Sequence, residues 1–268
     1  MGDYCGGMRR TPRLLVSSVA LFGFLAASCG SDADSASITT TAVSGDVTVF
    51  AASSLTEAFT EIGDAFAAAN PDAKVVFNFA GSGDLVTQIG QGAPADVFVS
   101  ADDANMTKLT DAGENVGEPI SIAQNTMEII VEHGNPKAIT SVADLARDGL
   151  IVVLCADTVP CGKNAAKVLA NAGVSVSPAS LEDKVKGVVT KVTTGEADAG
   201  IVFVTDVDSA GGKAEGVTIP DDINVISNDP IVITKQAPNA EAGQAFIDFV
   251  ASPAGQAILA TYGFLPPR

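Results

Sequence analysis

The sequence predicts an α/β protein that folds as two lobes with a ligand cleft between them. Three observations predict this class: apolar strand patterns alternate with helical periodicity, the alternation restarts near the middle of the chain, and the chain crosses between the two halves twice. Two crossings form a hinge rather than a linker. A cleft between two α/β lobes is a common place for a small ligand.

In the first half, three short apolar runs each precede a helical pattern. The strands are predicted at residues 47–51, 75–80 and 97–100, and the helices at 55–68, 85–89 and 106–112. This alternation is typical of a parallel sheet with crossover helices. We assign residues 46–125 to lobe I, which the end of the chain, residues 229–268, completes.

The same rhythm restarts after a strand at residues 126–131 that leads out of lobe I. The later elements of lobe II, residues 126–228, are predicted at 142–147, 151–156, 164–171, 183–194, 199–204, 217–219 and 225–226. A return strand at 231–234 and helices at 240–250 and 253–261 then close lobe I. The two crossings are expected near Thr126 and Asp229.

The N-terminal residues 1–28 are predicted to be removed from the mature protein. Three arginines precede an apolar or small run at residues 14–27, and Cys29 closes a small-residue segment. This resembles a bacterial lipoprotein signal peptide, and the run is too short to span a bilayer. The resemblance implies a lipidated Cys29, a flexible tether at residues 29–45 and anchoring to the outer face of the cell membrane. A plain secretory peptide is the alternative, and translation starts at Met1 or Met8.

Charge and aromatic content exclude several partners. The whole chain has a formal net charge of −17, and loss of three Arg and one Asp with residues 1–28 leaves −19. Nucleic acid and anionic membrane surfaces are therefore not expected to bind. The chain has no Trp, and Tyr262 is the one tyrosine after residue 28, so a stacking platform for sugars or bases is not expected.

Cys155 and Cys161 form an even pair six positions apart in an oxidising compartment. A disulfide is the preferred interpretation, with two buried free thiols as the alternative. A C-x-x-C redox motif is absent from the sequence, and two thiols with one distant histidine do not support a zinc site.

Four junctions between a strand end and a helix start indicate an anion site. They contain Ser53 and Ser54, the run Gly81-Ser82-Gly83, residues 158–163 and residues 182–186. A helix start offers free backbone N–H groups and the positive end of a dipole, to which serine hydroxyls add donors without charge. For one junction taken alone, simple helix capping is the better interpretation.

Enzymatic motifs do not match these junctions. Val86 replaces the third glycine of a dinucleotide fingerprint, and Ala80 and Asp84 replace the flanking glycines of a hydrolase G-x-S-x-G motif. A serine hydrolase would need His133, the one histidine of the chain, next to Ser54 or Ser82. His133 is expected on the surface, and we predict a binding protein rather than an enzyme.

Five motifs resemble one family when they are taken together. They are V-F-A-A-S-S-L at 49–55, G-A-P-A-D-V-F-V-S-A-D at 92–102, V-P-C-G at 159–162, A-D-A-G-I-V-F at 197–203 and Y-G-F at 262–264. In this order they resemble the extracytoplasmic molybdate-binding proteins of ABC transporters, over residues 47–266. The resemblance implies a two-lobe, type II periplasmic-binding-protein-like fold. It also implies a monomer without cofactor that closes over molybdate or tungstate and delivers it to an ABC permease with its ATPase.

The resemblance also implies the contact residues. Ser54 and Ser82 would give hydroxyl and backbone donors, and Cys161 and Val185 would each give a backbone N–H. Phe203 departs from the family, which has a tyrosine hydroxyl donor at this position. Loss of one donor to a charged ligand costs about 1.5–3 kcal/mol, or about 10- to 150-fold in affinity, unless water or Thr205 substitutes. Phe203 is either a pocket wall that tolerates molybdate or a sign of changed specificity.

The rival ligand is another tetrahedral oxyanion, phosphate or sulfate. Molybdate and tungstate carry no proton at neutral pH, so a site made of donors alone suits them, whereas a carboxylate facing the ligand would favour protonated phosphate. Asp84 is the residue that decides between these ligands, and we expect it to point to solvent at its helix start. Lys163 and Lys186 follow proposed donors and are expected to be solvated on helix surfaces.

Overall fold

The computed structural model describes residues 43–268. The predicted signal peptide, Cys29 and nearly all of the predicted tether lie outside the described residues. Within 43–268, no helix is both long enough and apolar enough to cross a membrane.

The first lobe is built on three parallel strands. Its elements are β1 (Gly45–Ala52), α1 (Thr56–Ala69), β2 (Ala73–Ala80), α2 (Ser82–Gly90), β3 (Val97–Val99) and α3 (Asp103–Asp111), with a 3-10 turn, Ser53–Leu55, between β1 and α1. β1 pairs in parallel with β2 on one side and with β3 on the other. The strand begins at Gly45, which the sequence assigned to the tether.

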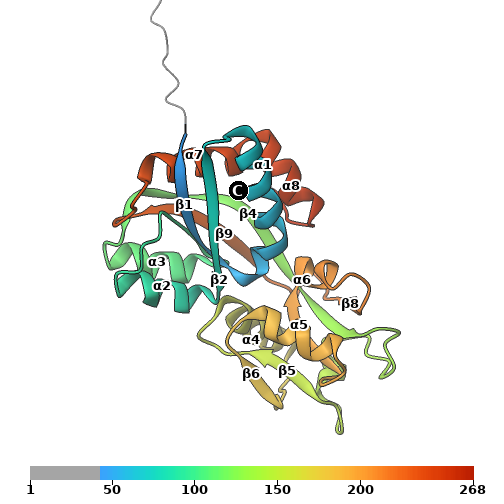
Figure 1. Cartoon of the computed structure of the whole chain (residues 1–268). Coiled ribbons are helices and arrows are strands. Elements are labelled where there is room, and N and C mark those ends of the chain that lie inside the picture. Colours follow the sequence, from blue (N-terminus) through green and yellow to red (C-terminus); the bar gives the residue numbers. More distant parts are fainter. Residues whose placement is uncertain (1–42) are drawn as a thin grey trace, which may run out of the picture. The chain divides into compact units, whose positions relative to one another are not determined.

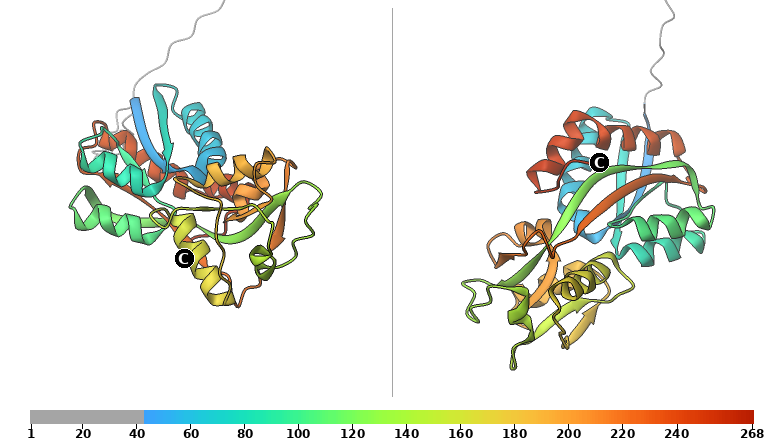
Figure 2. Two further views of the ribbon diagram at one scale, coloured as in Figure 1. Left: turned by 90° about the horizontal axis from the view of Figure 1, so that it is seen from below. Right: turned by 180° about the vertical axis from the view of Figure 1, so that it is seen from behind.

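Two faces of this sheet are covered by different helices, because successive strand residues point to opposite sides. Val47, Val49 and Ala51 of β1 pack into the larger core with α1, whereas Phe50 packs with Leu85 of α2 in a second core. Figures 1 and 2 show α1 on the same side of the lobe as the closing helices α7 (Ala240–Ala251) and α8 (Pro253–Thr261).

Two long antiparallel strands join the halves of the molecule. β4 (Asn115–Glu132) pairs with β9 (Ile226–Thr234) up to Thr126, and from Met127 onward it pairs with strands of the second lobe. β9 in turn pairs with β3, so one continuous path of strands runs through both lobes.

The sequence prediction for these two strands was wrong. It placed a strand only from residue 126 and divided β9 into two short pieces. The first part of β4 is mostly exposed and contains Gly117 and Pro119, and its register with β9 shifts twice, so it lacks a regular apolar alternation. Asp229 and Pro230 similarly interrupt the apolar pattern of β9.

The second lobe has its own small sheet. Its strands are β5 (Val152–Cys155), β6 (Ser180–Glu182), β7 (Ala199–Phe203) and β8 (Ala214–Thr218), and its helices are α4 (Pro160–Ala172), α5 (Val185–Thr193) and α6 (Val204–Ser209), with a 3-10 segment, Val142–Ala146. β5 runs parallel to β6 and β7, while β4 is antiparallel to β7 and β8. The sequence missed β6 and α6, because three and six residues are too few to show a period.

Three helices, α2, α3 and α4, begin at least three residues earlier than predicted, and two of these starts affect the site. The structure starts α2 at Ser82 and α4 at Pro160, whereas the apolar periodicity predicted starts at residues 85 and 164. Proline at the first helical position is favourable because its missing N–H has no partner there. As a result, Ser82 and Cys161 lie in the first turns of their helices.

An aromatic cluster anchors the closing helices on lobe I. The ring of Phe246 in α7 is fully buried and makes edge contacts with Phe59, Phe66 and Phe77, at centroid distances of 6.1, 5.4 and 6.2 Å. Such pairs stabilise the fold beyond the area that they bury.

The substitution Phe246→Ala is expected to lower the free energy of unfolding by about 3–5 kcal/mol, because it leaves a cavity among three rings. Phe249→Ala, on the same helix, should cost clearly less, since Phe249 is partly exposed and contacts one ring, that of Phe66. Urea denaturation followed by circular dichroism measures both, and equal losses would contradict this assignment of the core.

Candidate functional site

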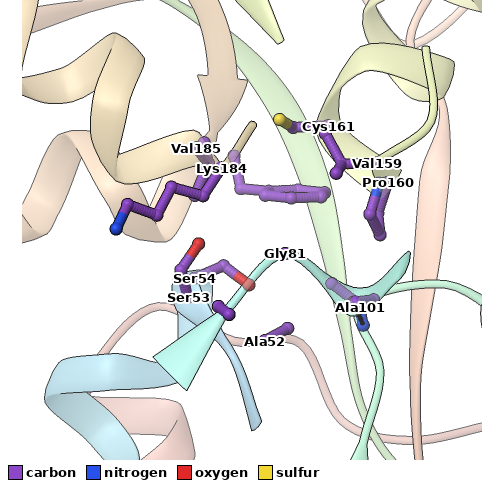
Figure 3. Close-up of a pocket in the computed structure, with 13 residues that line it drawn as sticks. Ala52, Ser53, Ser54, Gly81, Ala101, Val159, Pro160, Cys161, Lys184 and Val185 are labelled. Carbon is purple, nitrogen blue, oxygen red and sulfur yellow. Dashed lines mark hydrogen bonds between the residues drawn. The ribbon is translucent and has the colours of Figure 1, made fainter. Parts of the chain in front are cut away.

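Four helix starts converge on one pocket, which has an enclosed volume of about 20 Å³. It is lined by Ala52, Ser53, Ser54, Ala80, Gly81, Ser82 and Ala101 from lobe I, and by Val159, Pro160, Cys161, Lys184, Val185 and Phe203 from lobe II. Figure 3 shows the labelled residues of the two groups facing each other across the pocket. All five predicted contact residues, Ser54, Ser82, Cys161, Val185 and Phe203, lie in this lining.

The serines of lobe I are buried and their hydroxyls can donate. Ser82 is fully buried, and its Oγ accepts a hydrogen bond from the Ala101 N–H at 3.2 Å. This contact uses an acceptor site of the hydroxyl and leaves its single proton free to donate. Among the hydrogen bonds of residues 43–268, none uses the Oγ of Ser53 or Ser54, so both hydroxyls remain available beside Ser82.

The first turns of α4 and α5 supply the donors of lobe II. Val159 caps α4, so that Cys161 is its second residue, and Lys184 caps α5, so that Val185 is its first. The N–H groups of a first helical turn have no carbonyl partner inside the helix. Since Cys161 and Val185 line the pocket, these N–H groups and two positive dipole ends belong to its wall.

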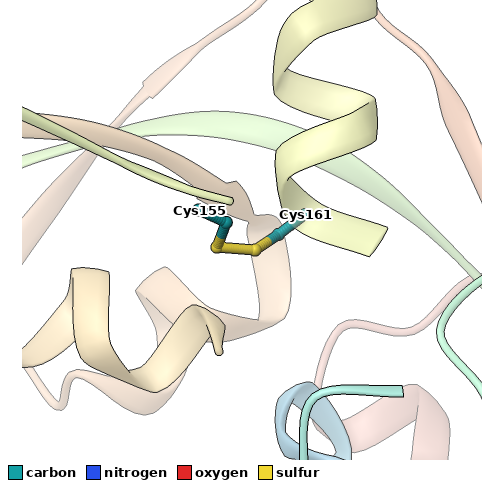
Figure 4. Close-up of a disulfide and its surroundings, with 2 residues drawn as sticks. All are labelled: Cys155 and Cys161. Carbon is teal, nitrogen blue, oxygen red and sulfur yellow. A yellow bond between two sulfur atoms is a disulfide. The ribbon is translucent and has the colours of Figure 1, made fainter. Parts of the chain in front are cut away.

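A disulfide ties the start of α4 to the end of β5 (Figure 4). Cys155 and Cys161 are bonded, with their Cα atoms 5.8 Å apart. The bond closes the short loop before α4, and it therefore restricts where the Cys161 N–H points.

Two glycines allow the close approaches on which the pocket depends. A Cβ at Gly81 would lie 2.6 Å from the Asp183 carbonyl oxygen in the opposite lobe. At Gly162, a Cβ would lie 1.9 Å from the Ala156 carbonyl oxygen, inside the loop that the disulfide closes. Any side chain at Gly81 would therefore hold the two lobes apart.

Phe203 ends β7 and contributes an almost fully buried aromatic wall to the pocket. Thr205, which we considered as a replacement donor, is not in the lining, and its Oγ1 accepts a hydrogen bond from Asn125 Nδ2 at 2.8 Å. The structure therefore places no protein hydroxyl from this segment in the pocket, among the residues that it describes.

The charges around the pocket favour an anion. Of the described residues that line it, Lys184 alone is charged, and none is a carboxylate or a histidine. Asp84 is exposed and lies outside the lining, as does His133, whose side chain is 73% exposed. Between residues 43 and 268, no group of three or more His, Cys, Asp or Glu side chains is placed to hold a metal ion.

The expectation that Lys163 and Lys186 are solvated was wrong. Lys163 Nζ lies 3.1 Å from Asp102 Oδ2, and Lys186 Nζ lies 2.7 Å from Glu57 Oε2. Both lysines belong to lobe II and both of these carboxylates to lobe I. The sequence missed these pairs because their partners are 61 and 129 residues away.

Two carboxyl groups outside the pocket lining, those of Asp206 and Asp229, are buried. Burial raises the pKa of Asp206 to about 6, although Lys186, 3.2 Å away, favours the ionised form. Burial also raises the pKa of Asp229, in β9, well above its ordinary range, and the negative charges of Asp206, Asp102 and Asp103 act in the same direction.

A family model matches nearly the whole described part of the chain. The model of the bacterial extracellular solute-binding proteins matches residues 47–265. This chain belongs to that family. A solute-binding protein of this family is extracytoplasmic, and its fold is the two-lobe α/β fold that the sequence predicted.

Three similar proteins bind molybdate or belong to a molybdenum transporter, according to their names. The molybdate-binding protein ModA of Mycobacterium tuberculosis H37Rv is 42% identical over 254 residues, which cover 94% of this chain and 97% of the relative. The substrate-binding domain of a putative molybdenum ABC transporter from Clostridium difficile is 27% identical, with a TM-score of 0.63 over 82% of this chain and 98% of that chain. The periplasmic molybdate-binding protein of Azotobacter vinelandii, at 22% identity, shares the fold, with a TM-score of 0.73 over 83% of this chain and 100% of that chain.

Sequence reasoning missed several residues of the pocket. Ser53 was treated as interchangeable with Ser54, and both prove to line the pocket; Ala101 and Lys184 were not singled out at all. Lys184 had a usable signal, because it immediately precedes a proposed donor at a helix start. Ala101 had none, since an alanine carries no chemistry that a sequence can reveal.

The raised pKa of Asp206 predicts a definite pH dependence. The folded protein binds the proton of the Asp206 carboxyl group more tightly than the unfolded chain does. The contribution of this proton to the stability of the fold is therefore complete below pH 4 and is lost as the pH rises through 6. Asp206→Asn removes this contribution. Calorimetric melting at pH 5, 6 and 7 should therefore show that the melting temperature of the variant, relative to that of the wild type, increases as the pH rises. A difference in melting temperature that stays constant over this range would contradict the raised pKa of Asp206.

Proposed function

We propose that this protein binds molybdate or tungstate outside the cell and delivers it to an ABC permease with its ATPase. The observation that carries the proposal is the pocket itself. Serine hydroxyls and first-turn N–H groups of four helix starts meet there, and the described lining holds no carboxylate. Such a site stabilises a small anion with fixed dipoles.

The absence of a carboxylate from the described lining favours an anion that carries no proton. Molybdate and tungstate are fully deprotonated at neutral pH, whereas phosphate is partly protonated and gains from a carboxylate that accepts its proton. The position of Asp84 also supports molybdate or tungstate over phosphate, because this carboxylate is exposed and is not part of the pocket lining. The enclosed volume of about 20 Å³ is far below the roughly 300–1,000 Å³ of pockets for drug-sized ligands and suits an ion of a few atoms.

Closure of the lobes is the mechanism of capture. We take residues 46–125 and 229–268 as lobe I and residues 126–228 as lobe II, because β4 leaves its pairing with β9 after Thr126. Donors from both lobes contact the same anion only in the closed form, so the ligand shifts the population toward closure. The permease then recognises the closed protein.

The site supports binding rather than catalysis. His133 is exposed and is not part of the lining that contains Ser54 and Ser82, and the family is one of solute-binding proteins. No cofactor enters the proposal. We also propose a monomer that is anchored through a lipidated Cys29 after loss of residues 1–28, in line with the sequence pattern there.

Isothermal calorimetry with molybdate, tungstate, sulfate and phosphate at one ionic strength tests the ligand. We expect submicromolar affinity for molybdate or tungstate. Phosphate should give little heat because the described lining has no carboxylate to accept its proton, and sulfate should give little heat because it is smaller than molybdate and is held less closely by the same donors. A clear binding signal with phosphate or sulfate, and no heat with molybdate, would leave the fold assignment unchanged and show that the proposed ligand is wrong.

Phe203→Tyr tests the departure from the family. If the tyrosine hydroxyl reaches the anion, molybdate affinity should rise about 10- to 150-fold, which corresponds to one added hydrogen bond to a charged group. Phe203→Leu, which keeps an apolar wall and adds no donor, is the control and should not gain affinity. Unchanged binding in the tyrosine variant would show that the wall at residue 203 does not contact the ligand.

A further inference from the structure

Both helices of lobe II that supply donors also carry a lysine that reaches across the cleft. Lys186 follows Val185 in the first turn of α5, and Lys163 follows Cys161 by two residues in α4. Their ammonium groups meet Glu57 of α1 and Asp102, the cap of α3, in lobe I. The same two helix starts thus hold both the proposed donors and a cation that contacts the opposite lobe.

Lys186 is held in place by its own lobe. Its Nζ donates to Ser209 Oγ at 2.8 Å and lies 3.2 Å from Asp206 Oδ1, and both partners belong to α6 of lobe II. Its remaining short contact is the hydrogen bond to Glu57 Oε2, at 2.7 Å. The ammonium is therefore oriented before it meets lobe I, which lowers the entropy cost of that contact.

The partner of Lys163 is oriented in a similar way. Asp102 Oδ1 caps α3 by accepting the Asn105 N–H at 2.7 Å, which leaves Oδ2 for Lys163 at 3.1 Å. The side chains of Lys163 and Asp102 are 25% and 11% exposed, and those of Lys186 and Glu57 are 21% and 38% exposed. Partial desolvation makes such pairs stronger than ion pairs on an open surface.

We propose that Lys186 and Lys163 are positioning residues that latch the closed lobes and slow release of the bound anion. The Lys186–Glu57 and Lys163–Asp102 pairs break when the lobes separate, because each joins lobe II to lobe I. They hold the first turns of α5 and α4, and with them the Val185 and Cys161 N–H groups, against the pocket. This inference rests on the proposed function for its ligand, but closure itself can be measured without any ligand.

The first test uses Glu57→Gln, which removes the lobe I charge and leaves Lys186 with its partners in α6. Release of radiolabelled molybdate from the purified full chain should be about 3- to 10-fold faster, with the association rate changed less than about twofold. Glu61→Gln is the matched control on the same helix, because Glu61 accepts a hydrogen bond from Tyr262 within lobe I. Equal release rates for the wild type and Glu57→Gln, or an equal increase in the control, would overturn the latch.

Lys163→Gln tests the second pair, with Lys167→Gln as its control one turn further along α4. Lys167 is exposed and forms no ion pair among the described residues.

Combined with Glu57→Gln, Lys163→Gln should raise the release rate about 10- to 100-fold, the product of two separate effects. Added salt should accelerate release from the wild type and change the double variant much less, since screening weakens the same two pairs. A double variant as slow as the wild type would refute the proposal.

Hydrogen exchange of the ligand-free full chain separates this proposal from the proposed function. Amides of residues 53–56 and 185–189, which face each other at the pocket, should exchange faster in the double variant than in the wild type or the control variants. Identical exchange in all of these proteins would overturn the latch. If no protein binds molybdate but the exchange difference is present, the proposed ligand fails and the latch stands.

Discussion

The pocket depends on one constraint of parallel strands: their carboxyl ends lie at the same edge of a sheet, and a helix starts after each of them. β1 and β2 lead to the turn at Ser53 and to α2, and β5 and β6 lead to α4 and α5. Each lobe therefore brings two sets of unpaired N–H groups to one edge, and the crossing strands make the two edges face each other. Glycine at residue 81 is part of this constraint, because the opposing backbones approach too closely for a Cβ.

Local electrostatics outweigh the net charge of the chain. A formal charge of −17 would repel an anion at long range, yet the described lining contains serines, alanines, first-turn amides and one lysine. Asp102 and Glu57 of lobe I are each paired with a lysine of lobe II, and Asp229 is buried with a raised pKa. Fixed dipoles at short range can therefore determine what binds.

The sequence was most informative where structure is determined locally. A serine or glycine after an apolar run marks a helix start with a chemical reason, so Ser54 and Ser82 could be proposed from the residues themselves. Cys161 and Val185 were named through the resemblance to a known family, and the structure gathers all four residues around one pocket. Contacts between distant segments could not be predicted. The partner of Lys186 is 129 residues away, and the exposed half of β4 has no apolar period, because its position is set by pairing with β9.

A crystal structure of the protein with tungstate would show where the anion binds, because the anomalous scattering of tungsten locates it. We expect one tungsten peak in the pocket, with ligand oxygens within hydrogen-bond distance of the hydroxyls of Ser54 and Ser82 and of the first-turn N–H groups at Cys161 and Val185, and with no carboxylate in contact. A peak bound by carboxylates, or one outside this pocket, would contradict this expectation.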